Sequence, residues 1–188
     1  MKKVTLFIAM SLDGYIADCS GGVDWLTGTG TQETDSYGDF IQEIDTVIMG
    51  GNTYRQITTQ LSPNIWPYEG MKSYVITHRG TAASRDDIYM VHQSPCDLVR
   101  QLREQDGKGI WICGGAQVVR QLMEADLIDR YHFSVIPVLL GDGIPLLVPG
   151  MRKHLLRLVS TQSYNGITDL IYERREQAAE QPSSSAQC

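Results

Sequence analysis

The chain is poor in cysteine, and it has no long apolar run. Its four cysteines are widely spaced, with no CxxC pair, so neither a thiol-ligated metal nor a disulfide framework is indicated. We expect reduced thiols and a cytoplasmic protein. No apolar stretch approaches the ~20 residues that span a bilayer. The four histidines show no metal-ligand spacing, which predicts no metal site.

Positive charge is also scarce. The 188 residues carry 16 Lys and Arg against 22 Asp and Glu, for a net charge of −6. This balance argues against nucleic acid or an anionic membrane as the main partner, although a local basic pocket for a phosphorylated small molecule remains possible. The length fits one domain, expected over residues 1–175, and the Gln-, Ala- and Ser-rich residues 176–188 are expected to be disordered.

Short apolar runs alternate with helical patterns along the chain. The runs are continuously apolar, as in strands covered on both faces. Strands that alternate with helices predict right-handed βαβ crossovers and an α/β fold with a mostly parallel sheet flanked by helices. The expected strands are 4–10, 46–49, 73–77, 88–91, 110–113 and 131–136, and the expected helices lie near 37–44, from Pro95 through Leu102, and near 116–125.

The C-terminal part departs from this alternation. Residues 137–150 are rich in Gly and Pro and predict an irregular loop. Two later strands, near 155–163 and 168–174, are joined by Asn165-Gly166, which is a strong signal for a hairpin turn. We therefore expect an antiparallel C-terminal hairpin on the sheet.

Three expected strands end in residues that suit a phosphate. Gly114-Gly115 would let a backbone approach a ligand at a helix start, although a tight turn without a ligand fits equally well. Gly50-Gly51 is followed by Asn52 and Thr53, both candidate helix N-caps. The third strand ends in Thr77-His78-Arg79, where Arg suits bidentate phosphate contacts. In parallel sheets, ligands gather at such strand ends.

Several motifs together resemble the dihydrofolate reductase superfamily. They are Ala9-x-Ser11-Leu12-Asp13-Gly14-Tyr15-Ile16-Ala17, then Trp25, Val47-Ile48-Met49-Gly50 with Thr53, and Ile112-Cys113-Gly114-Gly115. The Ser-Leu-Asp-Gly stretch, Asp24–Gly28, and Leu127-Ile128-Asp129 running to Pro137–Gly141 are similar to its riboflavin-biosynthesis branch, the RibD C-terminal family. The resemblance covers residues 1 to 174.

The resemblance implies an NADPH-dependent reductase. Ala9 and Ile16 would line the nicotinamide, and a cis bond would join Gly114 to Gly115. Thr77, His78 and Arg79 would surround the 2′-phosphate. The phosphates would lie between two groups of residues: Gly50, Gly51, Asn52 and Thr53 on one side, and Gly114, Gly115, Ala116, Gln117 and Val118 on the other.

The substrate side departs from the family pattern. The carboxylate that follows the tryptophan in dihydrofolate reductases is missing after Trp25, and Asp35 is the candidate catalytic acid, with Glu33 equally placed. Either residue could instead simply stabilise a helix start. Candidate substrate-binding residues are Ser11, Asp13, Trp25 and Ser134. Cys113 stands where the riboflavin branch commonly has an acid, and it more plausibly serves as a small buried residue than as a nucleophile.

We expect hydride transfer to a small pterin- or ribosylaminopyrimidine-like substrate. The resemblance implies a place in riboflavin biosynthesis. Weak dihydrofolate reduction is an alternative activity. A non-catalytic nucleotide-binding or sensor protein is the alternative class, favoured by the missing carboxylate. The resemblance also implies a homodimer.

Overall fold

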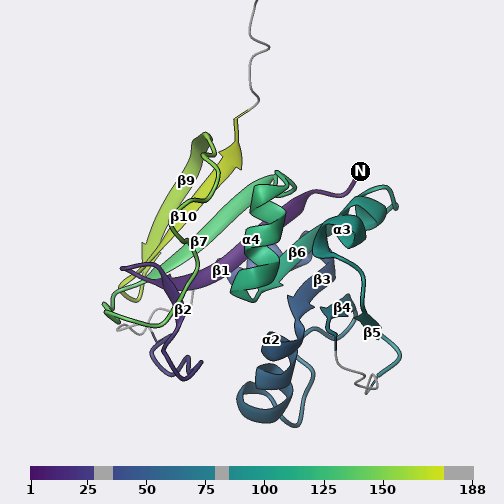
Figure 1. The fold of residues 1–188 in the computed structure, drawn as a ribbon, viewed down its shortest axis with the longest axis horizontal. Coiled ribbons are helices and arrows are strands. Elements are labelled where there is room, and N and C mark those ends of the chain that lie inside the picture. The colour runs from purple at the N-terminus through teal and green to yellow at the C-terminus, as the bar shows by residue number, and fades with distance from the viewer. Residues whose placement is uncertain (28–35, 79–84, 176–188) are drawn as a thin grey trace, which may run out of the picture.

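The computed structural model describes residues 1–27, 36–78 and 85–175, and its centre is an eight-stranded sheet (Figure 1). The strand order is β5-β4-β3-β6-β1-β7-β10-β9. Its strands are β1 (Val4–Ser11), β3 (Ile44–Gly50), β4 (Lys72–Ile76), β5 (Ile88–Val91), β6 (Gly109–Gly114), β7 (Arg130–Ile136), β9 (Leu156–Tyr164) and β10 (Ile167–Arg174). A small second sheet pairs β2 (Tyr15–Ala17) with β8 (Ile144–Pro145).

The sheet is parallel except at its C-terminal hairpin. Strand β1 pairs in parallel with β6 and β7, and β3 pairs in parallel with β4 and β6. Strand β10 runs antiparallel to both β7 and β9. The hairpin turns at Asn165 and Gly166, which both have positive φ, as a two-residue turn of this kind requires. The predicted α/β class and hairpin are confirmed.

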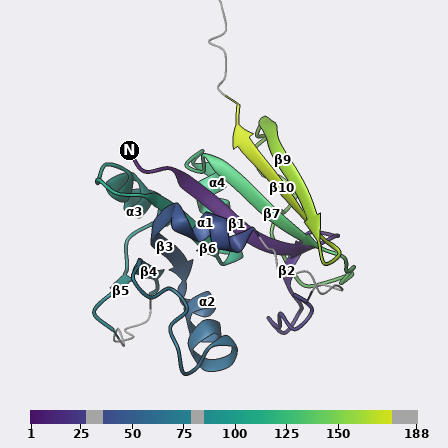
Figure 2. The same ribbon diagram turned by 180° about the vertical axis from the view of Figure 1, so that it is seen from behind.

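Helices cover both faces of the sheet. Helices α3 (Pro95–Arg103) and α4 (Ala116–Glu124) lie on one face (Figure 1), and α1 (Tyr37–Gln42) lies on the other (Figure 2). The α3 and α4 face buries an aliphatic core that includes Leu6, Ile112 and Leu122. The α1 face buries an aromatic core that includes Phe40 and Trp111. Within the described ranges, no helix is long and apolar enough to cross a membrane.

Helix starts follow the sequence signals in one case and not in another. Ser94 caps α3 by accepting a hydrogen bond from the Asp97 N–H at 3.1 Å, with a proline at the first helical position, as predicted. The prediction for α2 (Gly51–Gln56) was wrong, because its N-cap is Gly50 and not Asn52 or Thr53. The chain passes from β3 into the helix without an intervening loop, so both candidates lie in the first turn.

A five-residue π-helix, η1 (Ile57–Leu61), extends α2, and the sequence did not indicate it. The Thr58 hydroxyl donates to the Tyr54 carbonyl at 3.0 Å, and the Thr59 hydroxyl donates to the Arg55 carbonyl at 2.8 Å. These bonds offer the backbone a local alternative at the point where the helix widens. Widened turns of this type occur frequently at functional sites.

We predict that Leu122→Ala lowers the free energy of unfolding by about 2–5 kcal/mol, because the Leu122 side chain is fully buried between α4 and the sheet. Urea unfolding measures the change. Leu158 is the control, since 52% of it is exposed on β9; Leu158→Ala should stay within about 0.5 kcal/mol of the wild type. Equal losses in both variants would contradict this description of the core.

Candidate active site

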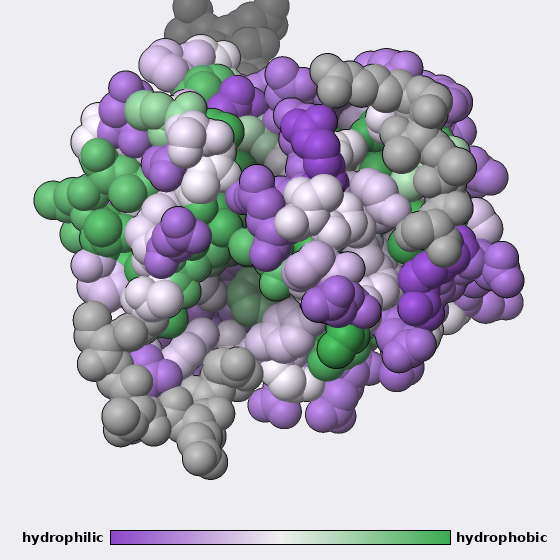
Figure 3. Space-filling view, turned by 90° about the horizontal axis from the view of Figure 1, so that it is seen from below, coloured by the Kyte–Doolittle hydropathy of each residue, from purple (hydrophilic) through white to green (hydrophobic). Residues whose placement is uncertain are grey.

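A cleft of about 1770 Å³ opens where β1, β3, β4 and β6 end. It is bounded by α2, η1 and the segment after β2, which project from the sheet at the lower side of Figure 1. Seen from that side, the molecule is hollowed near its centre, and hydrophobic residues lie at the bottom of the hollow (Figure 3). A pocket for one drug-sized ligand occupies about 300–1,000 Å³, so the cleft has room for two ligands side by side.

The structure gathers the predicted cofactor residues in this cleft. Arg79 lies outside the described residues. The others all line the cleft: Ala9, Ile16, Gly50, Gly51, Asn52, Thr53, Thr77, His78, Gly114, Gly115, Ala116, Gln117 and Val118. Apart from Ile16, which lies in β2, they come from the last parts of four parallel strands and from the starts of two helices, so the parallel topology brings them together. We call this part of the cleft the glycine half.

Two glycine turns meet in the glycine half. The Gly114–Gly115 peptide bond is cis, as predicted. A Cβ placed on Gly115 would lie 3.2 Å from the Thr53 hydroxyl oxygen, and one placed on Gly51 would lie 3.2 Å from the Thr77 hydroxyl oxygen. Both distances are tighter than ordinary van der Waals contact. A side chain at either glycine would therefore press on a threonine hydroxyl that faces the turn.

The start of α4 leaves backbone donors available. Its N-cap is Gly115, and no side chain caps it. The N–H groups of Val118 and Val119 bond to the Gly115 carbonyl, whereas the first N–H groups of a helix have no partner within it. Such a helix start favours an anionic ligand, above all a phosphate.

Strands β4 and β5 are fixed to each other at the edge of the glycine half. The Thr77 N–H donates to the Val91 carbonyl at 3.0 Å, and His92 Nδ1 lies 2.6 Å from the Thr77 carbonyl oxygen. His78 and His92 are both exposed and both line the cleft. This edge therefore presents two imidazoles and a hydroxyl to a ligand.

The opposite part of the cleft is aromatic, and we call it the aromatic half. Trp66 and Tyr68 pack edge to face with ring centroids 5.2 Å apart, and Tyr68 packs in the same way on Trp111 at 5.1 Å. The Trp111 indole donates to the Phe7 carbonyl at 2.9 Å, which fixes its orientation. Edge-to-face pairs are rigid and favourable, so this wall is preformed.

Cys113 joins the two halves. The β3 and β6 pairing runs from Ile48 opposite Ile112 to Met49 opposite Gly114, so Cys113 is an extra residue in β6. A bulge of this kind re-aims a side chain, and Cys113 lines the cleft with its Sγ 3.4 Å from the Tyr68 hydroxyl. Burial raises the pKa of Cys113 to about 11 and also raises the pKa of Tyr68, so both groups keep their protons at neutral pH.

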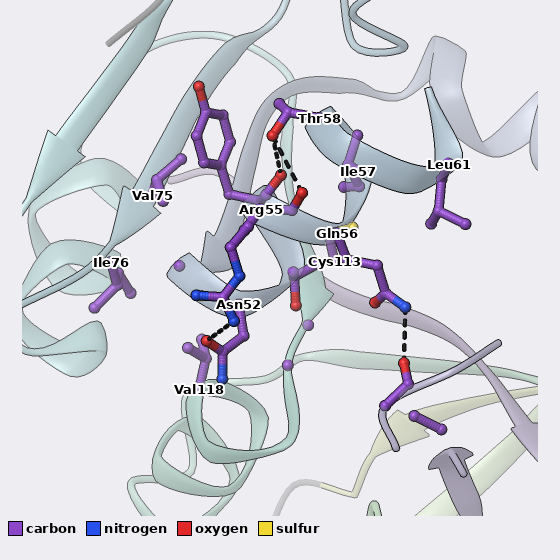
Figure 4. Close-up of a pocket in the computed structure, with 18 of the residues that line it drawn as sticks. Asn52, Arg55, Gln56, Ile57, Thr58, Leu61, Val75, Ile76, Cys113 and Val118 are labelled. Atoms are coloured by element: carbon purple, nitrogen blue, oxygen red, sulfur yellow. Dashed lines mark hydrogen bonds between the residues drawn. The ribbon is translucent and has the colours of Figure 1, made fainter. Parts of the chain in front are cut away.

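A hydrogen bond bridges the mouth of the cleft. The Gln56 side-chain amide donates to the Gly21 carbonyl at 2.8 Å and ties α2 to the segment after β2 (Figure 4). That segment is itself ordered by Asp18, whose carboxylate accepts from the N–H groups of Ser20 and Gly22. Figure 4 also shows Ile57 and Leu61 on one side of the cleft, away from Ile76 and Val118.

Three predicted substrate residues lie away from the described cleft lining. Ser11 donates to Asp13 at 2.6 Å, and Asp13 accepts from the N–H groups of Leu140 and Gly141. These two residues fasten the loop after β7 to the turn after β1. The Trp25 indole donates to the Gly22 carbonyl at 3.3 Å. Their described contacts are therefore structural.

Ser134, the fourth predicted substrate residue, belongs to a buried polar cluster behind Phe7. Its hydroxyl donates to Asp169 at 2.6 Å, and Asp169 is fully buried. The same carboxylate accepts from Ser36 and lies 3.2 Å from His132 Nε2. The His132 ring stacks on Phe7 with centroids 4.0 Å apart. Sequence analysis missed Asp169, because a single acid in an amphipathic hairpin strand carries no local signal.

The charge of Asp169 is compensated by its neighbours. Burial by itself would raise the pKa of this carboxyl group, but hydrogen bonds from His132, Ser134 and Ser36 outweigh burial and hold the pKa well below its ordinary value. Gln162 adds a contact at 3.3 Å. Asp169 is therefore an ionised carboxylate inside the protein, tying the C-terminal hairpin to β7 and to the residue before α1.

The candidate acids Asp35 and Glu33 lie outside the described residues, as does Arg79. Among the described residues that line the cleft there is no aspartate or glutamate. The phenol and thiol groups among the described residues of the aromatic half belong to Tyr37, Tyr54, Tyr68 and Cys113.

The fold and the cleft define an α/β protein of the dihydrofolate-reductase-like type. The model of the RibD C-terminal domain matches residues 2–172, and the chain belongs to that family. The uncharacterized protein YwjB of Bacillus subtilis is 36% identical over 92% of this chain and 98% of its own length. YyaP of the same organism is 26% identical over 91% of this chain and 94% of its own.

Solved structures show the same fold. A protein from Shewanella sp. PV-4, named for riboflavin biosynthesis, superposes with a TM-score of 0.80 at 26% identity, covering 93% of this chain and 99% of that one. The diaminohydroxyphosphoribosylaminopyrimidine deaminase/5-amino-6-(5-phosphoribosylamino)uracil reductase of Thermotoga maritima gives 0.70 at 17% identity, covering 93% of this chain and 57% of that one. At this lower identity the likeness concerns the fold alone.

We predict that Asp169→Asn destabilises the protein at pH 7 and that the difference from wild type shrinks in acid. A carboxylate with a lowered folded-state pKa adds stability above its unfolded pKa of about 3.9, and this is lost as pH falls toward the folded value. Urea unfolding from pH 7 to pH 3 measures this. Asp106→Asn, at an exposed position, is the control. A difference from wild type that is constant across this range would contradict the assignment.

Proposed function

We propose that this protein is a nicotinamide-dependent reductase that binds NADPH in the glycine half and a hydride acceptor in the aromatic half. One observation carries the proposal: every described residue that the resemblance assigns to the cofactor lies in one cleft. Membership of the RibD C-terminal family and the named reductase among its structural neighbours support a reductase.

The residues present fit a dinucleotide. Glycine at positions 51 and 115 keeps the hydroxyls of Thr77 and Thr53 close to the backbone of the two turns, and the absence of a side chain there allows a pyrophosphate to approach that backbone. The uncapped start of α4 offers N–H donors to the same group. Ala9 and Ile16, at the other end of the glycine half, present small and aliphatic surfaces that suit the flat nicotinamide ring.

A bound nicotinamide supplies the hydride, and the chain supplies position and surroundings. The rigid walls of the aromatic half hold an acceptor ring against the cofactor and exclude water. Tyr68 and Cys113 are both protonated and hydrogen-bond to each other, so one of their two protons stays available to an acceptor at the junction of the halves. These contacts orient an acceptor carbonyl or ring nitrogen beside the nicotinamide position.

The preference for NADPH over NADH rests on the end of β4. Thr77 and His78 line the cleft there, and Arg79 follows directly in the sequence. A hydroxyl, an imidazole and a guanidinium are suitable partners for a 2′-phosphate. The acceptor belongs to the small heteroaromatic compounds, of which pterins and ribosylaminopyrimidines are the first to test.

We expect Arg79→Ala to weaken NADPH binding roughly tenfold or more while NADH binding hardly changes, because a charged hydrogen bond contributes about 1.5–3 kcal/mol. Titration by tryptophan fluorescence or calorimetry measures both affinities. Arg100→Ala is the matched control, since Arg100 is an exposed residue of α3 paired with Asp97. Equal weakening of both cofactors would remove Arg79 from the 2′-phosphate site.

Turnover tests the reductase itself. Oxidation of NADPH, followed by its absorbance, should depend on an added acceptor from a panel of pterins, pyrimidines and quinones. A protein that binds NADPH tightly but oxidises it with none of them would instead be a nucleotide-binding protein without this activity.

A further inference from the structure

The positive charges of the described residues can all be located relative to the cleft. Among the 16 Lys and Arg residues, the described ones that line it are Arg55 and Arg85. The segments outside the described residues contain one more, Arg79, which follows β4 at the glycine half. Residues 28–35 hold no Lys or Arg, and they include two acids, Glu33 and Asp35.

Neither lining arginine serves the aromatic half. Arg55 donates to the Asn52 side chain at 3.0 Å, and Figure 4 shows its guanidinium pointing toward that residue on the glycine side. Arg85 is paired with Asp87 at 2.9 Å and with Glu69 at 3.1 Å. The histidines that line the described cleft, His78 and His92, follow β4 and β5 and also belong to the glycine half.

The described rim of the aromatic half is uncharged, and exposed aliphatic side chains stand on it among neutral polar ones. Leu61 is 55% exposed and Ile65 is 72% exposed, and both line the cleft beyond the buried side chain of Ile57. Leu26 contributes from the segment after β2. Exposed aliphatic side chains around an aromatic pocket are typical of surfaces that take up an apolar ligand.

We infer that the aromatic half selects a flat, uncharged aromatic compound and discriminates against the same ring carrying a phosphate. This inference rests on the proposed function and narrows its acceptor class. An anion placed there would lose water without gaining a cationic partner among the described residues that line the aromatic half. Phosphorylated ribosylaminopyrimidines therefore fit this protein less well than neutral ring systems.

Riboflavin and its 5′-phosphate, FMN, test the inference, because they share one ring and differ by a phosphate. Calorimetry with NADP⁺ comes first. If NADP⁺ does not bind, the proposed cofactor is contradicted, and the inference about the aromatic half is still tested by the flavins. The two flavins are then compared by fluorescence, at saturating NADP⁺ so that the glycine half is filled, or in buffer if NADP⁺ does not bind. We expect riboflavin to bind at least about tenfold more tightly, a difference of about 1.4 kcal/mol.

A charge placed on the rim locates the effect. Leu61→Arg should lower the ratio of riboflavin affinity to FMN affinity severalfold. The new charge is not buried, because Leu61 is half exposed. Leu158→Arg is the matched control, with 52% exposure on β9, and should leave the preference unchanged. The inference is overturned if FMN binds as tightly as riboflavin, if neither flavin binds, or if both arginine variants give the same preference.

Discussion

The close approach of two backbone turns at the carboxyl ends of β3 and β6 is the constraint on which the site depends. Gly50 lies so near this meeting point that a Cβ on it would be 3.6 Å from the Gly115 nitrogen. The register of β3 and β6 allows this approach only because Cys113 is added to β6 just before the cis bond. One inserted residue thus brings the turns together and directs a thiol toward Tyr68.

The glycine half could be predicted from the sequence because its signals are local. Each strand, its glycines and the following helix are contiguous in β3 and α2 and in β6 and α4, and the parallel topology then places these two units side by side, next to the end of β4. The aromatic half gave no such signal. Its walls come from Phe7, Trp111 and the stretch around Trp66 and Tyr68, and their meeting depends on tertiary packing. The π-helix carries no periodicity that a sequence pattern could reveal.

Asp169 shows the same limit in another form. The sequence of β10 is that of an ordinary hairpin strand. The structural role of Asp169 is visible only in the folded protein, where Ser36, His132 and Ser134 converge on its carboxylate. A buried carboxylate is tolerated only with such partners, so it specifies the position of the hairpin against β7 and α1. Because the His132 ring stacks on Phe7, the hydrogen bonds of Asp169 also help to fix the position of Phe7 in the wall of the cleft. The hairpin is therefore part of the support of the site, although it lies at the far edge of the sheet.

The chain between α2 and β4 lies outside the sheet, and it supplies Ile57, Leu61, Trp66 and Tyr68 to the aromatic half. The turns of the glycine half are built into strand ends, where substitution disturbs the sheet. In the proposed enzyme, much of the acceptor wall is thus encoded in a stretch of the gene that is separate from the cofactor turns, while Phe7 and Trp111 come from the sheet. Mutations in the chain between α2 and β4 can change the acceptor wall without altering the cofactor turns. New reductases can therefore diverge on this fold by changes in that one segment.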